Sequence, residues 1–421
     1  MTGERRAPVM PVGRFRRVMR GALIFVAVMG PGIITANVDN DAGGITTYVL
    51  AGANFGYSML WTLVPITIAL VVVQEMCSRM GAVTGKGLAD LIRETFGVRW
   101  TFWMMVALVV SNIGNTIAEF SGIAASLEIF GIPRWVSVPL SALGVWVLVL
   151  AGTARAVERI FLVACVLYIA YPISGFLAHP PWGEALRSTV IPTVHSDAAW
   201  ITMVIGLVGT TIAPWMQFYL QSAVVEKGIK PEEYAASRLD VIVGCILTDV
   251  VAFFIVVAAA STLYAAKVHV ETADQAALAL EPLAGRYCAW LFAAGLFNAS
   301  LFAASILPLA TAFSVCEAFG WESGIDKRWD DAKQFYALYT GILVIGAAVV
   351  LVPGLPLIPV MIVTQVANGV LLPVVLVFML ILANREALMG RYRNGPIFNV
   401  IAWTTTVVCS GLTLWLLVTQ L

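Results

Sequence analysis

Two carboxylates stand in the middle of an otherwise apolar stretch near the start of the chain. Asp39 and Asp41 fall inside residues 21–51, and two adjacent glycines, Gly43 and Gly44, follow them. A charged group is costly at mid-membrane depth, and it is tolerated where unwound backbone lines a cavity. Because the apolar residues after the glycines are too few to cross a membrane alone, we expect one broken helix here.

A second interrupted stretch covers residues 198–225 and holds Thr210, Ala213, Pro214 and Trp215 near its middle. Proline has no backbone N–H, so a carbonyl near Thr210 loses its helical partner. Freed carbonyls and a carboxylate are oxygen ligands of the kind that hard divalent cations prefer. Two broken helices at matching positions of an inverted repeat indicate a transport site near the membrane midplane.

Further polar side chains lie within the apolar stretches, where ionisable groups are functional candidates. We expect Asp41 to bind a cation together with Gly44, Thr210, Ala213 and Gln365. The candidates for a vestibule or for energy coupling are Asp39, Glu119, Trp215 and Asp249.

The composition of the chain predicts that membrane-spanning helices position these residues. The 421 residues are 60% hydrophobic and 12% charged, with a mean hydropathy of +0.89, whereas soluble domains are about 25% charged. A soluble enzyme, a disordered chain and a nucleic-acid binder are excluded, and an all-α, multi-pass protein partnered by a lipid bilayer is expected. Eleven spans are predicted at 21–51, 57–79, 100–130, 135–153, 159–178, 198–225, 239–265, 286–317, 334–353, 356–383 and 396–419.

Basic residues alternate between the connections. Of the 25 Lys and Arg residues, 21 fall in the N-terminus and every second connection, and the alternate connections hold Arg134, Arg187, Lys267 and Arg286. This bias predicts a plasma (inner) membrane protein with a cytoplasmic N-terminus and an external C-terminus. The expected parts are a basic N-terminus (1–20), a transport core (21–383) of two repeats (21–178 and 198–383), an eleventh helix (396–419) and an interfacial helix (85–96).

Several segments resemble the NRAMP family of divalent-metal transporters. They are Gly30-Pro31, Asp41-Ala42-Gly43-Gly44, the run from Ala51 to Tyr57, the run from Met80 to Gly85, the run from Gly209 to Pro214, Tyr219-Leu220-Gln221-Ser222, and Gln365 with Pro373. The resemblance covers nearly the whole chain. It implies a fold like that of the inverted-repeat (LeuT-like) amino-acid transporters, with 5+5 helices and broken helices 1 and 6.

The chain departs from the family's usual motifs at the site itself. The resemblance aligns Ala42 and Gly44 with the usual proline and asparagine of an Asp-Pro-Gly-Asn motif. It aligns Ala213 and Trp215 with the methionine and histidine of Met-Pro-His, and Thr116 with an acidic residue three positions before Glu119. These departures resemble the NRAMP-related magnesium transporter (NRMT) branch.

The predicted function is uptake of Mg²⁺, and also of Mn²⁺, by alternating access. Alanine at position 213, where the family usually has methionine, leaves the site without a soft thioether ligand. The small residues Gly44 and Ala213 predict a roomy site for a largely hydrated ion. Because Trp215 and Thr116 do not titrate in the useful range, we expect transport without proton coupling.

Other functions are kept as alternatives. They are a proton-coupled Mn²⁺/Fe²⁺ transporter of the same family, an organic-cation or amino-acid transporter, and a channel. An intramembrane enzyme is disfavoured because all three histidines lie in hydrophilic connections and no HExxH motif occurs. We expect no cofactor other than the transported ion, and a monomer is compatible with the sequence.

Overall fold

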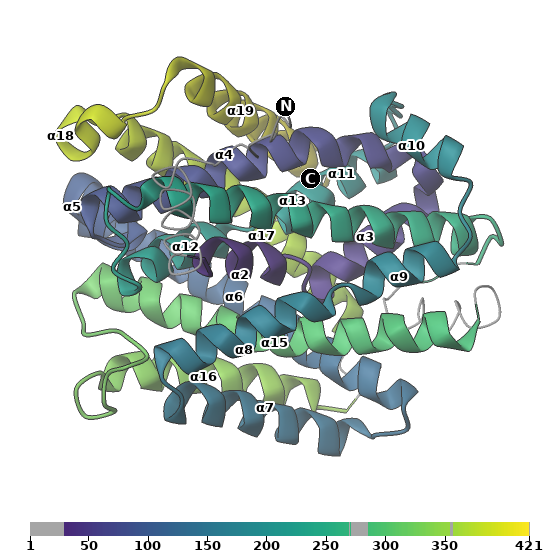
Figure 1. Ribbon diagram of the computed structural model, residues 1–421, viewed down its shortest axis with the longest axis horizontal. Helices are drawn as coiled ribbons and strands as arrows, with labels where there is room; N and C mark the ends of the chain where they lie inside the picture. The colour runs from purple at the N-terminus through teal and green to yellow at the C-terminus, as the bar shows by residue number, and fades with distance from the viewer. Residues whose placement is uncertain (1–28, 269, 271–284, 354–356, 421) are drawn as a thin grey trace, which may run out of the picture.

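A computed structural model describes residues 29–268, 270, 285–353 and 357–420, and every regular element in these residues is helical. The helices run side by side along the long axis of the molecule (Figure 1). Their bounds are α2 Pro31–Val38, α3 Ala42–Phe55, η1 Gly56–Met59, α4 Leu60–Thr84, α5 Leu88–Phe96, α6 Val98–Ile129, α7 Arg134–Ala151, α8 Ala154–Leu167, α9 Ala170–Leu177, α10 Trp182–Val190, α11 Ala198–Thr211, α12 Pro214–Glu226, α13 Tyr234–Ala259, η2 Ala260–Tyr264, α15 Arg286–Phe319, α16 Lys333–Val350, α17 Leu357–Asn384, α18 Glu386–Met389, η3 Gly390–Tyr392 and α19 Pro396–Gln420.

Ten helical stretches of the described chain are long and apolar enough to cross a membrane. They are Ala42–Thr84, Val98–Glu128, Arg134–Ala151, Ala154–Leu177, Ala198–Glu226, Tyr234–Tyr264, Arg286–Phe319, Lys333–Val350, Ala367–Asn384 and Pro396–Trp415. The prediction divides the first of these into the end of span 1 and all of span 2. Residues 21–28 of the predicted first span, and the basic N-terminus (1–20), lie outside the described residues, so the count of eleven stays a prediction.

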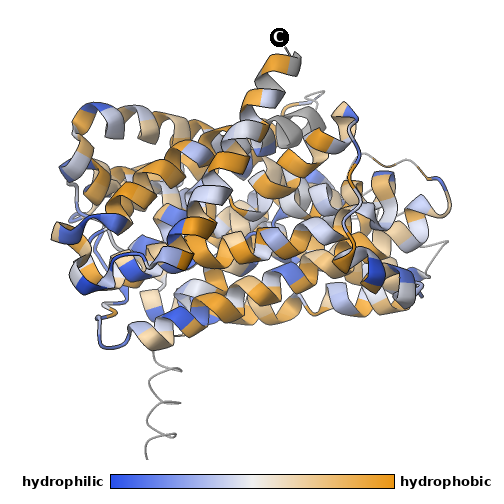
Figure 2. Cartoon of the chain, turned by 90° about the horizontal axis from the view of Figure 1, so that it is seen from above, coloured by the Kyte–Doolittle hydropathy of each residue, from blue (hydrophilic) through white to orange (hydrophobic). Residues whose placement is uncertain are grey.

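The distribution of hydropathy fits a membrane-embedded bundle. Apolar residues cover the long helices and hydrophilic residues gather in the connections at their ends (Figure 2). The predicted interfacial helix is present as α5, which buries Leu88, Leu91 and Ile92 on one face.

Both predicted helix breaks are present. The first separates α2 from α3, where Asp41 has extended backbone angles and caps α3. The second separates α11 from α12, where Pro214 is the first residue of the new helix. Proline is well suited to that position because its missing N–H has no helical acceptor there.

A third break, between α8 and α9, is absent from the sequence prediction. Pro172 has no N–H to donate to the carbonyl of Tyr168, four residues earlier, and the N–H of Tyr171 binds that carbonyl instead at 3.1 Å. The Tyr168 hydroxyl then reaches the first break and donates to the Asn40 carbonyl at 3.2 Å.

The broken helices lie in the interior of the bundle, with α13 packed along α2 and α3 (Figure 1). Glycines allow this close approach. A β-carbon added at Gly32 would lie 2.6 Å from the Val241 nitrogen, and one added at Gly244 would lie 2.7 Å from the Gly32 carbonyl oxygen. The rim helices α7, α8 and α19 instead leave many large apolar side chains exposed, as expected for a lipid-facing surface.

Candidate metal-binding site

The Asp41 carboxylate lies at the N-terminus of α3, in the gap left by the first helix break. Its Oδ1 accepts a hydrogen bond from the Gly44 N–H at 2.7 Å, and the residue is only 5% exposed. An aspartate is a favoured N-cap because it binds a free amide of the first turn and its charge opposes the helix dipole. The sequence therefore fixes both the start of α3 and the position of the acid.

Three of the residues predicted to surround Asp41 are brought together: Gly44, Thr210 and Gln365. A β-carbon added at Gly43 would lie 2.0 Å from Gln365 Nε2 and 3.3 Å from Asp41 Oδ1. One added at Gly44 would lie 3.3 Å from Thr210 Oγ1 and 3.4 Å from Asp41 Oδ1. Three elements distant in sequence thus meet at the glycine pair: α3, α11 and α17.

Backbone occupies the space beside Gly44 in this structure, and the roomy site for a hydrated ion stays a prediction. A β-carbon at Gly44 would lie 2.4 Å from the Asp39 carbonyl oxygen, so backbone already fills the space that the glycine leaves. Asp41, Thr210, Ala213 and Gln365 are all buried. Gly44 is therefore needed for close packing of the broken helix.

The second helix break places Thr210 and Ala213 on either side of Ile212. Pro214 cannot donate to the Thr210 carbonyl four residues earlier, so this oxygen lacks its usual helical donor. Ala213 caps α12 with extended backbone angles. The Thr211 hydroxyl is bonded to the Tyr48 hydroxyl at 2.8 Å, which ties this break to α3.

Glu119 reaches the first helix break from α6. Its Oε2 accepts the Ala42 N–H at 3.1 Å, its Oε1 has no partner, and the side chain is fully buried. Glu119 and Asp41 are close enough for their charges to interact. The structure thus places this predicted coupling residue beside the candidate site.

Gln365 belongs to a polar network that sequence reasoning largely missed. Asn368 donates to Gln365 Oε1 at 3.4 Å and to Asn115 Oδ1 at 3.2 Å, and Ser111 donates to Asn368 at 2.5 Å. The spacing of Ser111, Asn115 and Glu119 at four-residue intervals puts them on one face of α6. That regular spacing is the signal that could have found the network.

Asp39 and Asp249 are both buried, and none of their carboxylate oxygens has a hydrogen-bond partner. Glu128, by contrast, is exposed and pairs with Arg134 at 3.0 Å.

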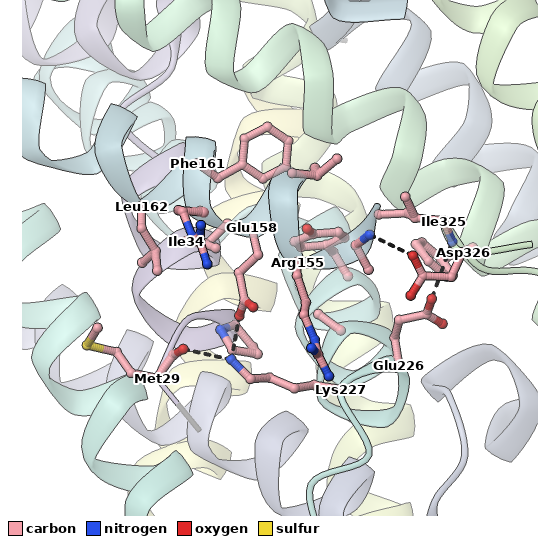
Figure 3. A pocket seen from close by; sticks show the side chains of 17 residues that line it. Met29, Ile34, Arg155, Glu158, Phe161, Leu162, Glu226, Lys227, Ile325 and Asp326 are labelled. Carbon is pink, nitrogen blue, oxygen red and sulfur yellow. Dashed lines mark hydrogen bonds and ion pairs between the residues drawn. The ribbon is translucent and has the colours of Figure 1, made fainter. Parts of the chain in front are cut away.

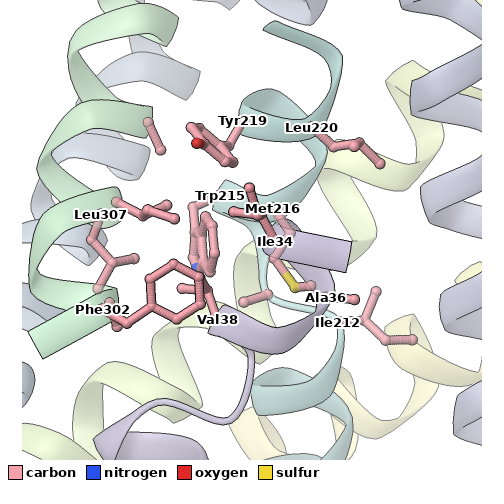
Figure 4. Close-up of a cluster of buried hydrophobic side chains, with 14 of the residues drawn as sticks. Ile34, Ala36, Val38, Ile212, Trp215, Met216, Tyr219, Leu220, Phe302 and Leu307 are labelled. Atoms are coloured by element: carbon pink, nitrogen blue, oxygen red, sulfur yellow. The ribbon is translucent and has the colours of Figure 1, made fainter. Parts of the chain in front are cut away.

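Trp215 packs among apolar side chains in the first turn of α12. It is 1% exposed and sits in a cluster of buried apolar side chains with Ile34 and Val38 of α2 and Phe302 and Leu307 of α15 (Figure 4). The tryptophan therefore packs the interface between α2, α12 and α15.

A cavity of about 700 Å³ opens beside this apolar cluster, and Ile34 contributes to both (Figures 3 and 4). At its edge Lys227 Nζ contacts Glu158 Oε1 at 2.5 Å and donates to the Met29 carbonyl at 2.7 Å. The basic residues of the cavity belong to the set that the sequence predicts to be cytoplasmic. The apolar cluster thus lies between this cavity and the break that holds Asp41.

Oxygen atoms near Asp41 are the Thr210 hydroxyl and the Asp39 backbone carbonyl, whereas Gln365 turns its amide Nε2 toward Gly43 and its Oε1 toward Asn368. Within the described residues no group of three or more His, Cys, Asp and Glu side chains is arranged to hold a metal ion. An ion at this site would therefore depend on one carboxylate, neutral oxygens and water, a set that suits hard cations.

Known proteins resemble this chain over most of its length. The family model described as natural resistance-associated macrophage protein-like matches residues 32–419. The divalent metal cation transporter MntH of Aeromonas hydrophila is 26% identical over 94% of this chain and 96% of its own length. MntH of Erwinia tasmaniensis is 28% identical over 66% of this chain and 69% of its own length.

Solved structures show the fold. The Eremococcus coleocola manganese transporter, in complex with an aromatic bis-isothiourea compound, superimposes with a TM-score of 0.77 at 22% identity, over 96% of this chain and 88% of that one. MhsT in complex with L-phenylalanine gives 0.63 at 12% identity, over 93% and 98%. These likenesses confirm the predicted fold, and the two MntH proteins and the Eremococcus protein are named as transporters, not enzymes. Because the family model matches almost the whole chain, this protein belongs to the natural resistance-associated macrophage protein-like (Nramp) family.

Proposed function

We propose that the protein transports divalent metal ions across the membrane by alternating access, with Mg²⁺ and Mn²⁺ as substrates. The observation that carries the proposal is the Asp41 carboxylate, placed with Thr210 and Gln365 where two broken helices meet. The printed names of the relatives, a divalent metal cation transporter and a manganese transporter, support the substrate class.

The preference for Mg²⁺ is argued from the ligands. Position 213 is alanine, so the N-cap of α12 offers no sulfur to the site. Softer metals such as Cd²⁺ gain from thioether ligands, whereas Mg²⁺ and Mn²⁺ are served by carboxylate, carbonyl and water. Mg²⁺ also keeps several of its waters when bound. Since the site is closed in this structure, we propose that a hydrated ion enters when α2 or α12 moves.

We further propose that metal uptake needs no coupled proton. Trp215 has no group that titrates in the useful range, and apolar side chains surround it. With a potential that is negative inside, a divalent ion gains roughly 4.6 kcal/mol per 100 mV on entry. The gradient of the ion itself is then sufficient.

A proton-coupled Mn²⁺/Fe²⁺ transporter is the second candidate function. The buried Glu119, with one free oxygen beside Asp41, is the observation that favours it. In this case Fe²⁺ or Cd²⁺ would outcompete Mg²⁺, and the proteoliposome lumen would acidify as metal enters.

The test is metal flux into proteoliposomes that contain a metal-sensitive and a pH-sensitive dye. Asp41→Asn keeps a good N-cap for α3 but removes the charge, and we expect it to abolish Mg²⁺ and Mn²⁺ flux. Glu128→Gln removes an exposed carboxylate of α6 and is the matched control, with wild-type flux expected. Wild-type flux in Asp41→Asn would refute the proposed site.

A further inference from the structure

Two buried carboxylates that the proposed transport site does not use lie close enough for their charges to interact, where α13 packs against the broken helix. Asp39 follows the end of α2 and is 2% exposed, and Asp249 lies in the middle of α13 and is 6% exposed. We propose that Asp39 and Asp249 hold a divalent cation between them, in a second site beside the one at Asp41.

Hydrogen bonds join the residues that neighbour the two carboxylates in sequence. Asn40 Nδ2 donates to the Thr248 carbonyl at 3.0 Å and to its hydroxyl at 2.7 Å. The Thr248 hydroxyl donates to the Ala36 carbonyl at 2.6 Å. The neighbours of Asp39 and Asp249 are thus bonded to each other. Asp39 lies within electrostatic range of both Asp249 and Asp41.

The four carboxylate oxygens lack partners in a setting where partners are expected. Asp240 lies on α13, as Asp249 does, and its two carboxylate oxygens accept the N–H groups of Gly30 at 3.1 Å and Gly32 at 2.7 Å. No backbone N–H binds Asp39 or Asp249, and the Tyr48 hydroxyl beside Asp39 is bonded to the Thr211 hydroxyl at 2.8 Å. Thr67 lies beside Asp249, but its hydroxyl donates to the Leu63 carbonyl at 2.7 Å. An unpartnered buried carboxylate is costly, which favours a ligand that is bound here.

The charge of that ligand follows from the surroundings. Neither Lys nor Arg of the described chain is among the groups that act appreciably on the charge of Asp39 or Asp249. Two like charges in a buried site repel each other, and either a shared proton or a cation between them removes the repulsion. Paired carboxylates with hydroxyl oxygens from Thr67 and Tyr48 nearby form a hard donor set, which suits Mg²⁺ or Mn²⁺ with water completing the shell.

The second site adjoins the first through a single residue. The Asp39 carbonyl oxygen lies against Gly44, close to Asp41 Oδ1, while its carboxylate interacts with Asp249. A cation held by Asp39 and Asp249 would neutralise this pair and leave Asp41 to bind the transported ion. The inference concerns different carboxylates from those of the proposed transport site, so the two can fail separately.

The test is equilibrium binding of Mn²⁺ to the full-length protein in detergent. The concentration of free Mn²⁺ is measured by electron paramagnetic resonance. We expect two classes of site in the wild type. Asp39→Asn and Asp249→Asn should each remove the same class, Asp41→Asn should remove the other, and Glu128→Gln should remove neither. Wild-type binding by Asp249→Asn would overturn the proposal.

Thermal unfolding provides a second readout that does not depend on counting ions. Without metal, Asp249→Asn should unfold at a higher temperature than the wild type, because the repulsion with Asp39 is gone. With Mn²⁺, the wild type should gain more in unfolding temperature than this variant. If a shared proton neutralises the pair, the Mn²⁺-induced shift will be equal in both proteins, and the proposal is wrong.

Discussion

Glu119 and Asp41 bind amides of the same helical turn. Glu119 Oε2 accepts the N–H of Ala42 at 3.1 Å, and Asp41 Oδ1 accepts the N–H of Gly44 at 2.7 Å. The first turn of α3 is therefore held by one acid from its own cap and one acid from α6. A positively charged helix end between two carboxylates helps to keep both in a buried place.

Glu119→Gln separates the structural role of Glu119 from proton transfer. The amide oxygen of glutamine can still accept the Ala42 N–H, so the start of α3 should survive, but the side chain no longer carries a proton. If transport is uncoupled, we expect Mg²⁺ flux to keep its wild-type dependence on pH. Flux in proteoliposomes at several external pH values checks this. Luminal acidification that occurs in the wild type and is lost in the variant would contradict uncoupled transport.

Gly44→Ala should damage the site by overpacking. The added carbon would meet the Asp39 carbonyl oxygen at 2.4 Å, and forced shifts of this kind cost about 1–3 kcal/mol. We expect a lower unfolding temperature and strongly reduced metal flux. Gly144→Ala is the control, since its added carbon on α7 meets nothing within 4 Å. It should be neutral or stabilise the protein by up to about 1 kcal/mol. Equal unfolding temperatures for the two variants would refute the close packing at Gly44.

The helix breaks could be predicted from sequence because their causes are local. Pro214 lacks an N–H wherever it lies, and Asp39 and Asp41 interrupt an apolar run whatever surrounds them. The third break has an equally local cause in Pro172, but prolines are frequent in membrane helices and many of them leave a helix continuous.

The composition of the site could be predicted only in part. The sequence predicts Asp41, Thr210 and Gln365 at one site, and they lie together. Asp41 and Thr210 are marked by the local helix breaks, and Gln365 is a polar side chain in an apolar stretch. The room around Gly44 depends on the Asp39 carbonyl, which only the folded backbone places. The network through Asn115 likewise depends on how α6 and α17 face each other. The relative orientation of two helices cannot be predicted from the sequence of either helix alone.

Ala213→Met should shift the metal preference toward softer ions. The substitution adds a thioether at the cap of α12, and sulfur ligands favour Cd²⁺ over Mg²⁺. We expect Cd²⁺ to inhibit Mn²⁺ flux at lower concentrations than in the wild type. Ala151→Met, on the exposed end of α7, should leave the competition unchanged. An unaltered ratio of Cd²⁺ to Mg²⁺ competition in Ala213→Met would show that position 213 does not face the ion.

Trp215→Ala should destabilise the interface between α2, α12 and α15. Removing a buried tryptophan from contact with Val38 and Phe302 leaves a cavity, and such changes typically cost about 3–5 kcal/mol. Trp135→Ala is the matched control, because Trp135 is 58% exposed on α7 and exposed substitutions usually stay within about 0.5 kcal/mol. Thermal unfolding in the same detergent compares the two variants.

Since the cluster around Trp215 lies between the cavity and Asp41, we also expect Trp215→Phe, which keeps most of the apolar volume, to retain stability and metal flux. A Trp215→Phe variant that folds normally but transports no metal would show that the indole itself takes part in transport.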